Sequence, residues 1–233
     1  MSTHGRRRGT SRRRKPQPDV PVLPAALDPL DVVGLRAQRE HEGVELVDCD
    51  FSGEHLSGSS LETARVKGCR FADAELRRLR FEQVVFETCD FANTSWFDCD
   101  LDEVAFVGCR FVGASITGGR LSAVLLRDCL AQMAKLSHLG RPHALLQGCD
   151  LRGALLMESD LSETRFADCD LGGLELFNAG LVGTDLRGNE LDDLKGVACL
   201  RGATIDALQL LALAPALATH VGLVVQEADV QES

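Results

Sequence analysis

A large apolar side chain recurs at every fifth position over most of this chain of 233 residues. No regular element has this period, because a helix repeats its faces about every 3.6 residues and a strand every 2. The frame runs from Leu46 to Leu191 without slipping, and only Arg141 breaks it. The position two residues earlier is small or moderately apolar, as at Cys49 and Ala114. Two positions in every five therefore face inward, and three face outward.

The cysteines supply a second period. Seven of them occupy the small position, each twenty residues after the last: Cys49, Cys69, Cys89, Cys109, Cys129, Cys149 and Cys169. A side of five residues within a turn of twenty gives four sides per turn, so we expect a square coil whose sides stack about 4.8 Å apart. So narrow an interior admits one large and one small side chain per side. The core should be thinnest where a phenylalanine column that ends at Phe111 shrinks to Ala131.

Nothing in the sequence concentrates reactive groups at one site. The nine cysteines form an odd number with no C-x-x-C pair, so we expect reduced thiols that fill space in a cytoplasmic protein. His138 and His143 lack the further ligands of a metal site, and no acid–base pair or phosphate-binding glycine loop is found. We therefore expect no catalytic residue, no metal, no cofactor and no enzymatic activity. No apolar run has the length of a membrane span.

Charge and composition divide the chain. Residues 1–18 contain seven Lys or Arg and no acid, which leaves 18 basic against 35 acidic residues in the remainder. We expect residues 1–18 to be a disordered tail. It is either a solvated arm without a partner or an arm that weakly contacts nucleic-acid phosphates or an acidic protein. Residues 19–45 should cap the first coil, residues 46–200 should form the repeats, and residues 201–233 should close the other end.

The C-terminal region has helical spacing in place of the five-residue frame. Asp206 and Gln209 have the spacing of an N-cap and N3 pair, and Gly222 is a suitable stop. Pro215 should kink this helix or start a second one. A short strand is expected at 223–225. The helix holds more Leu and Ala than one coil end needs, so we also predict a two-fold interface. Its residues are Leu208, Leu211, Leu213, Leu217 and Val221.

The repeats resemble a known family. Stretches such as "CDLRGALLMESDLSETRFADCDLGG" are similar to the pentapeptide-repeat family, whose loose motif is Ala/Ser/Cys, Asp/Asn, Leu/Phe and two free positions. The resemblance implies an all-β fold, a right-handed quadrilateral β-helix, which agrees with the coil expected from the two periods. With the C-terminal segment added, we expect this β-helix to carry an α-helical cap.

The C-terminal segment carries a narrower resemblance. Ile205, Asp206, Gln209 and the run 222–225 are similar to the end of Qnr-type and MfpA-type members. This resemblance implies that the C-terminal helix joins two coils into a dimeric acidic rod. Such a rod is shaped like B-form DNA and binds DNA gyrase or topoisomerase IV, and it can protect the enzyme from inhibitors such as quinolones.

The outward position before each large residue supplies acids along the rod. The candidate partner-binding residues are Asp90, Asp100, Asp150, Asp160, Asp170, Glu175 and Asp185. They are most consistent in the C-terminal turns, whereas arginines such as Arg70 and Arg110 interrupt the same position nearer the N-terminus. The alternative is that these acids serve only to keep a repeat protein in solution.

Two further features bear on the surface. Val85, Ala105, Leu125 and Leu145 share one outward position at intervals of twenty residues. This apolar stripe could bind a partner, but we favour its being covered by residues 19–45. A bulged corner is expected at residues 140–143, and a corner defect is favoured over a projecting functional loop.

Two classes of function follow from these features. The first is a non-enzymatic DNA mimic that regulates or protects a type II topoisomerase. The second is an interaction scaffold with another partner. Binding of nucleic acid through the tail is a third possibility.

Overall fold

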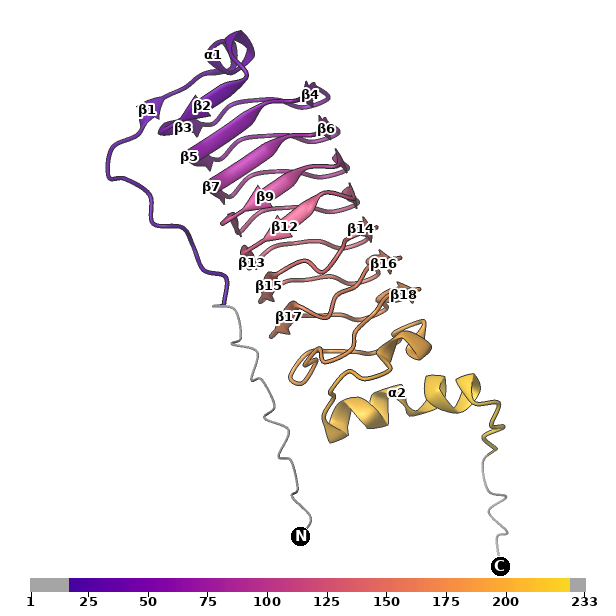
Figure 1. The fold of residues 1–233 in the computed structure, drawn as a ribbon. Helices are drawn as coiled ribbons and strands as arrows, with labels where there is room; N and C mark the ends of the chain where they lie inside the picture. The colour runs from indigo at the N-terminus through magenta and orange to yellow at the C-terminus, as the bar shows by residue number, and fades with distance from the viewer. Residues whose placement is uncertain (1–16, 227–233) are drawn as a thin grey trace, which may run out of the picture.

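A computed structural model describes residues 17–226, which form a rod of stacked coils between two helical ends (Figure 1). The predicted basic tail, residues 1–18, therefore lies almost wholly outside the described residues. Two parallel sheets run the length of the coil. Strands that neighbour each other within a sheet come from successive turns, so the chain forms the β-solenoid expected from its sequence.

The strands fall on three of the four sides. The larger sheet has eleven strands: β1 (Asp28–Pro29), β2 (Glu40–Glu42), β3 (Val44–Val47), β5 (Ser60–Lys67), β7 (Arg80–Glu87), β9 (Asp100–Asp102), β10 (Ala105–Val107), β12 (Arg120–Ser122), β13 (Val124–Arg127), β15 (Ala144–Gln147) and β17 (Thr164–Ala167). The smaller sheet has seven: β4 (His55–Ser57), β6 (Glu75–Arg77), β8 (Ser95–Phe97), β11 (Ser115–Thr117), β14 (Lys135–Ser137), β16 (Leu155–Met157) and β18 (Glu175–Phe177).

We name the sides in chain order. Side A carries β3, β10, β13, β15 and β17, with the second halves of β5 and β7. Side B is joined only by isolated bridges such as Asp90↔Arg110. Side C is the seven-stranded sheet, and side D carries β2, β9, β12 and the first halves of β5 and β7. Partners within the coil are offset by twenty residues, as in Phe86↔Phe106 and Phe106↔Leu126. The predicted period is therefore confirmed.

The core consists of ladders of like residues. Phe51, Phe71, Phe91 and Phe111 stack with ring centroids 4.8 to 4.9 Å apart, which is the spacing of the strands. The cysteines lie beside them, and the Sγ of Cys109 donates to the carbonyl oxygen of Phe86 at 3.5 Å. All nine cysteines are free. Burial raises the pKa of the Cys99 thiol, which makes such a thiol a poor nucleophile at neutral pH.

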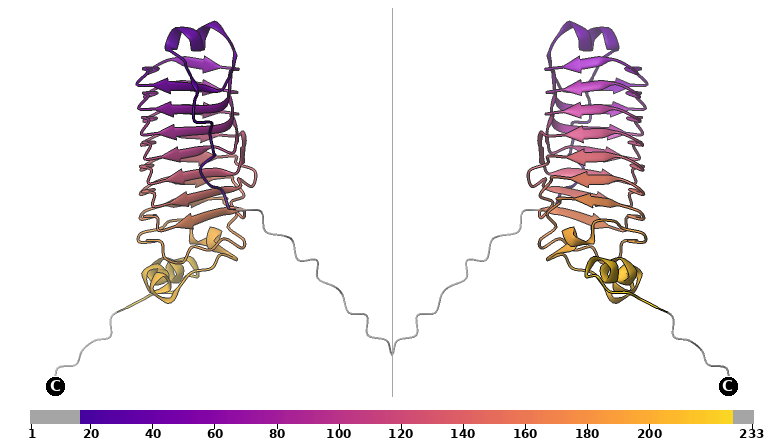
Figure 2. Two further views of the ribbon diagram at one scale, coloured as in Figure 1. Left: turned by 90° about the vertical axis from the view of Figure 1, so that its left-hand side faces the viewer. Right: turned by 90° about the vertical axis from the view of Figure 1, so that its right-hand side faces the viewer.

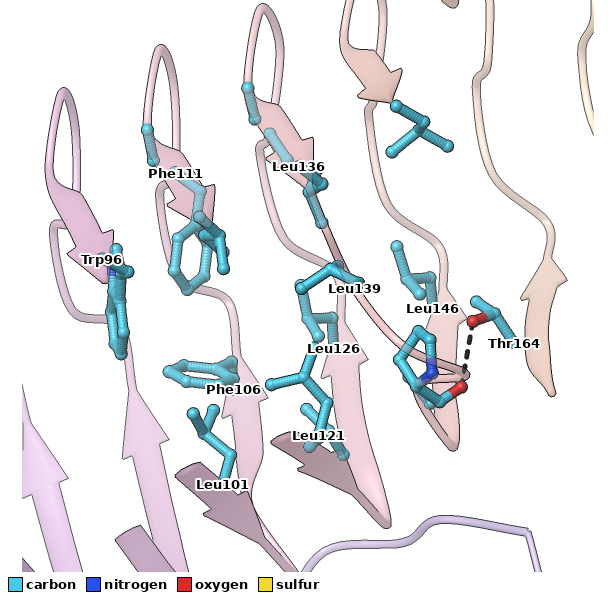
Figure 3. A pocket seen from close by; sticks show the side chains of 18 of the residues that line it. Trp96, Leu101, Phe106, Phe111, Leu121, Leu126, Leu136, Leu139, Leu146 and Thr164 are labelled. Atoms are coloured by element: carbon cyan, nitrogen blue, oxygen red, sulfur yellow. Dashed lines mark hydrogen bonds between the residues drawn. The ribbon is translucent and has the colours of Figure 1, made fainter. Parts of the chain in front are cut away.

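A cavity of about 80 Å³ interrupts the core where the aromatic ladder ends. Phe111, Ala131 and Leu151 line it on one side, and Figure 3 shows the change from aromatic to aliphatic side chains along the coil axis. The thin core predicted at Ala131 is therefore found. The lining is apolar, so the cavity offers water few hydrogen-bonding partners.

Filling this cavity should stabilise the coil. Ala131→Leu continues the leucine column upward from Leu151 and is expected to add about 1 to 2 kcal/mol to the free energy of unfolding, since cavities cost about 24 cal/mol per Å³. Ala154→Leu is the control, because Ala154 is fully buried and does not line the cavity. Overpacking there should cost about 1 to 3 kcal/mol. Chemical denaturation of both variants checks the prediction, and equal effects would contradict it.

The N-terminal region has two parts. Residues 17–27 run along the outside of side A, as the left view of Figure 2 shows, and we call them the strap. The chain then forms β1 and the helix α1 (Val32–Ala37), from which Val32 and Leu35 pack against the end of the core. The coil itself begins at β2, six residues before the predicted boundary at 46.

The C-terminal end is closed by a short 3-10 helix, η1 (Val197–Leu200), and by α2 (Ala207–His220). The predicted capping box is present, because Asp206 accepts from the backbone of Gln209 while the Gln209 side chain accepts from Asp206 N. Gly222 has φ +78° just after the helix, as a stop requires. Pro215 lies inside this one helix and does not start a second.

One sequence expectation is wrong, whereas the chain does leave the five-residue frame at the expected corner, residues 140–143. No strand forms at 223–225, because these exposed residues have no strand beside them with which to pair. At the expected corner, Arg141 turns outward with φ +52°, and its Nε donates to the Asp160 carboxylate at 2.7 Å. Pro142 is buried in its place, and its carbonyl accepts a hydrogen bond from Thr164 Oγ1 (Figure 3).

Candidate partner-binding surfaces

The predicted acids all lie on the surface, but each is paired with a base. The pairs are Arg110 with Asp90 (3.3 Å), Arg120 with Asp100 (4.0 Å), Arg152 with Asp150 (2.6 Å) and Asp170 (3.3 Å), Arg141 with Asp160 (2.7 Å), Lys195 with Glu175 (2.6 Å) and Arg187 with Asp185 (2.6 Å). Their negative charge is therefore partly neutralised by neighbouring bases, and Asp150 and Asp170 share one arginine. As contacts with a partner, all of these acids remain a prediction.

Coil geometry explains the pairing. An offset of twenty residues places a base directly beside an acid, as for Arg110 and Asp90 on side B. A base two residues after an acid reaches back along the same side, as for Arg187 and Asp185. The hydrogen bonds from Arg187 lower the pKa of Asp185 to about 2, and hydrogen bonds from Ser52 and Arg70 lower the pKa of Asp50 to about 2.

These shifts predict acid sensitivity. A carboxyl whose pKa is lowered in the folded state binds protons less readily than in the unfolded chain, so its stabilising effect is present above about pH 4 and is lost as the pH falls toward 2. Melting temperatures at pH 7, 4 and 3 should decline over that window. Arg187→Gln should return the pKa of Asp185 toward 3.8 and reduce the decline. A variant that loses stability between pH 4 and 3 as steeply as the wild type would contradict this account.

Unpaired acids form a separate column on side D. The four acids are in register on β2, β5, β7 and β9: Glu42↔Glu62, Glu62↔Glu82 and Glu82↔Asp102. All four are exposed, and none has an ion-pair partner among the described residues. We call this set the acidic column. The offset of twenty residues is visible in the sequence, but these acids follow the large residue of each repeat, whereas the predicted acids precede it.

The column concentrates negative charge. Its four residues follow one another at a backbone spacing of about 4.8 Å, and like charges directly opposite each other in a sheet are destabilising. The neighbouring Glu103 accepts a hydrogen bond from Gln83 at 3.0 Å and adds a further carboxylate at the same end of the rod. A cationic partner would relieve this repulsion, so electrostatic attraction of such a partner should be strongest on side D.

The predicted dimer surface on α2 is only partly exposed. Leu208, Leu211 and Val221 are 79%, 71% and 66% exposed. Leu213 is 1% exposed and belongs to the coil core, and Leu217 is partly buried against that core. The prediction is therefore wrong for Leu213, because this residue faces the last coil and cannot reach a second chain.

A buried polar contact sets the orientation of α2. The Gln209 side chain donates to the carbonyl oxygens of Leu186 at 2.6 Å and Asn189 at 2.7 Å. Leu213 follows four residues later on the same helix face. The opposite face of α2, together with the run 221–225, is the largest group of exposed apolar side chains at this end. Leu210 and the run 223–225 were missing from the predicted interface.

The apolar stripe on side A is covered. Val85, Ala105, Leu125 and Leu145 are buried, and Val20 of the strap packs against the last three. An ion pair between Asp19 and Arg127 at 3.6 Å lies beside this contact. The preference for coverage by residues 19–45 is therefore confirmed.

The described residues offer little for other chemistry. Within 17–226, no three His, Cys, Asp or Glu side chains gather as a metal site would require. In the same range no helix is both long enough and apolar enough to cross a membrane. Gln132 has a buried side-chain oxygen without a hydrogen-bond partner, but its amide nitrogen is held by Asp150 at 2.6 Å.

Comparison with known proteins supports the fold. Residues 79–154 match the family model for the pentapeptide repeat region, and residues 143–173 match the model for pentapeptide repeats in eight copies. No curated protein matches the chain. A trypsin-treated form of QnrB1, described as a plasmid-mediated fluoroquinolone resistance protein, aligns with a TM-score of 0.54 and 24% identity over 81% of this chain and 92% of its own.

A second solved structure is HetL, a pentapeptide repeat protein involved in heterocyst differentiation regulation from the cyanobacterium Nostoc sp. strain PCC 7120. HetL is 20% identical to this chain, and the alignment covers 76% of this chain and 97% of HetL with a TM-score of 0.32. The likeness to QnrB1 shows a shared fold. The two family models show that residues 79–173 consist of pentapeptide repeats, in agreement with the twenty-residue register of the coil.

Proposed function

We propose that this protein is a non-enzymatic DNA mimic that binds the DNA-binding surface of DNA gyrase or a related type II topoisomerase and protects the enzyme from inhibitors such as quinolones. The observation that carries the proposal is the acidic column on a straight rod. Outside residues 1–18 the chain has 35 acidic and 18 basic residues. A cationic surface that binds DNA would attract such a rod at long range.

The spacing of the column supports this choice of partner. One DNA strand carries one phosphate per about 3.4 Å of helix axis, and the column carries one carboxylate per coil, which is about 4.8 Å of rod axis. The two charge densities are of the same order. The column is straight because its residues share one register, whereas a collection of surface acids on an irregular fold would not be.

A homodimer would lengthen the rod. The exposed face of α2 includes Leu208 and Leu211, and the adjoining Val221 lies beside the exposed run 223–225. Burying this group against a second copy would join two coils end to end. The fold of QnrB1, a fluoroquinolone resistance protein, and the resemblance of the C-terminal segment to Qnr-type and MfpA-type members support this reading. A cytoplasmic location follows from the same proposal.

The decisive experiment is gyrase supercoiling across a titration of the purified protein, with and without a fluoroquinolone. Wild-type protein should inhibit supercoiling or restore it in the presence of the drug. Neutralising the column by Glu62→Gln, Glu82→Gln and Asp102→Asn should weaken the effect about tenfold or more, because charge-assisted contacts are each worth about 1.5 to 3 kcal/mol.

A matched control separates local from total charge. Asp73→Asn, Asp98→Asn and Asp128→Asn remove the same charge from coil corners and should change the titration far less. If both triple variants weaken the effect equally, the column has no special role. If wild-type protein has no effect at concentrations where sedimentation shows a dimer, the gyrase proposal is wrong.

An interaction scaffold is the second candidate function. The exposed apolar side chains at residues 221–225 favour it, since they suit a protein partner as well as a second copy. Leu211→Asp should abolish either contact. Loss of dimerisation without loss of gyrase inhibition would favour a monomeric mimic. The contribution of residues 1–18 to nucleic-acid binding remains a prediction, tested by the salt dependence of binding before and after their deletion.

A further inference from the structure

The first coil has an open interior. Leu46, Phe51 and Leu56 are its large inward residues, but no coil lies above Phe51 and Leu56, where the helix α1 takes its place. Leu56 is consequently only partly buried, whereas Leu76 directly below it is 1% exposed. A pocket of about 250 Å³ results, more than three times the volume of the cavity at Ala131.

The pocket has an apolar interior and a polar mouth. Its apolar lining comes from inward side chains of the first three coils, among them Phe71, Phe81 and Phe91. The mouth lies at the corner between sides C and D and is lined by Gln38, Arg39, His55, Ser57, Ser59 and Ser60. Water fills such an interior poorly, because the walls offer no hydrogen bonds and each buried water needs about three.

The charge at the mouth selects the ligand. Arg39 is exposed, its Nη1 lies over Gly58, and it has no ion-pair partner among the described residues. His55 pairs through Nδ1 with Glu75 at 3.2 Å, which leaves Nε2 free to face a ligand. Arg39 and the serine hydroxyls suit a single carboxylate. The acidic column begins nearby at Glu42, so a head with several negative charges would be repelled.

We propose that this pocket binds a small amphiphile with an unbranched apolar body and one carboxylate head, such as a medium-chain fatty acid. The carboxylate accepts hydrogen bonds from Arg39 and Ser60 at the mouth, and the apolar chain lies beneath α1, where Leu56 is only partly buried. The pocket volume of about 250 Å³ accommodates a chain of about eight carbons.

The chain contains its own reporter for this site. Trp96 is the only tryptophan, and its ring lies 5.3 Å from Phe91 and 6.2 Å from Phe81, both of which line the pocket. An octanoate brominated at its terminal carbon should therefore quench Trp96 fluorescence, whereas one brominated beside the carboxylate should quench it less. Titration calorimetry with hexanoate, heptanoate and octanoate should show affinity rising about fourfold per methylene.

Variants test both ends of the ligand. Arg39→Gln should weaken octanoate binding about tenfold, as expected for loss of a charged hydrogen bond, and Arg70→Gln should leave it unchanged because Arg70 is absent from the lining. Ser59→Leu places a leucine above the buried Leu79 in the same column and should block binding while keeping or raising the melting temperature.

Three results would overturn the proposal. The first is no quenching and no calorimetric signal with octanoate on the folded wild-type protein. The second is binding that Arg39→Gln and Ser59→Leu both leave unchanged, which would indicate an unrelated apolar surface such as α2. The third is equal or tighter binding of octylammonium, which would show that the mouth does not select a carboxylate.

Discussion

Gly119→Ala is expected to destabilise the protein by about 3 kcal/mol or more. A Cβ at this position would lie 2.1 Å from the carbonyl oxygen of Cys99 in the coil above, and the backbone has φ +79°. The added Cβ and the Cys99 carbonyl oxygen cannot separate without distorting the coil, because the Cys99 backbone is packed on both faces. The position is one of the inward small sites on side D, where Cys99 and Leu139 occur in the neighbouring coils.

Gly183→Ala separates the cost of the positive φ from the cost of the steric contact with Cys99. Gly183 has φ +82°, but no atom lies within 4 Å of a Cβ built there. This variant should lose only the conformational contribution, about 1 to 2 kcal/mol. Guanidinium denaturation of both variants measures the difference. Equal losses would show that the contact with Cys99 contributes nothing.

Removing the strap is the second change with a large expected effect. Among the described residues, no backbone hydrogen bond joins residues 17–27 to the coil, so the strap is held by apolar contacts and by the exposed pair of Asp19 and Arg127. Deleting residues 1–27 would expose Leu125 and Leu145, which are now 0% and 3% exposed. We expect a loss of about 3 kcal/mol in stability and self-association through side A.

Two controls accompany this deletion. Deleting residues 1–16 alone removes the basic segment and keeps the strap, so stability and oligomeric state should not change. Val20→Asp should reproduce part of the effect, whereas Val22→Asp should not, because Val22 is 98% exposed. Sedimentation velocity and dye binding to exposed apolar surface provide the readouts. A full deletion that stays as stable and as dispersed as the wild type would mean that the strap is not needed to cover side A.

The five-residue and twenty-residue periods were enough to predict the coil, its ladders and its thin point at Ala131. These features depend on the identity of inward residues, and a narrow interior leaves few alternatives. The outward face was harder to predict. Whether Asp185 carries free charge depends on the reach of Arg187 two residues away, and formal charge counts ignore that contact.

The orientation of α2 was also beyond the periodicity argument. Many helix residues are apolar, so spacing alone does not say which side meets the coil. The buried hydrogen bonds of Gln209 to Leu186 and Asn189 settle the question and bring Leu213 inward. The pocket beneath α1 could not be predicted either, because it arises from where the first coil stops and not from any residue pattern.

The constant offset of twenty residues restricts how such a protein can change length in evolution. From β3 to β18, strand residues pair with residues twenty positions away, as Phe106 pairs with Phe86. An insertion or deletion of one residue would place every later side chain against the wrong neighbour and turn inward residues outward. Duplication of a whole coil keeps every contact intact, so the rod can lengthen or shorten only in steps of one turn.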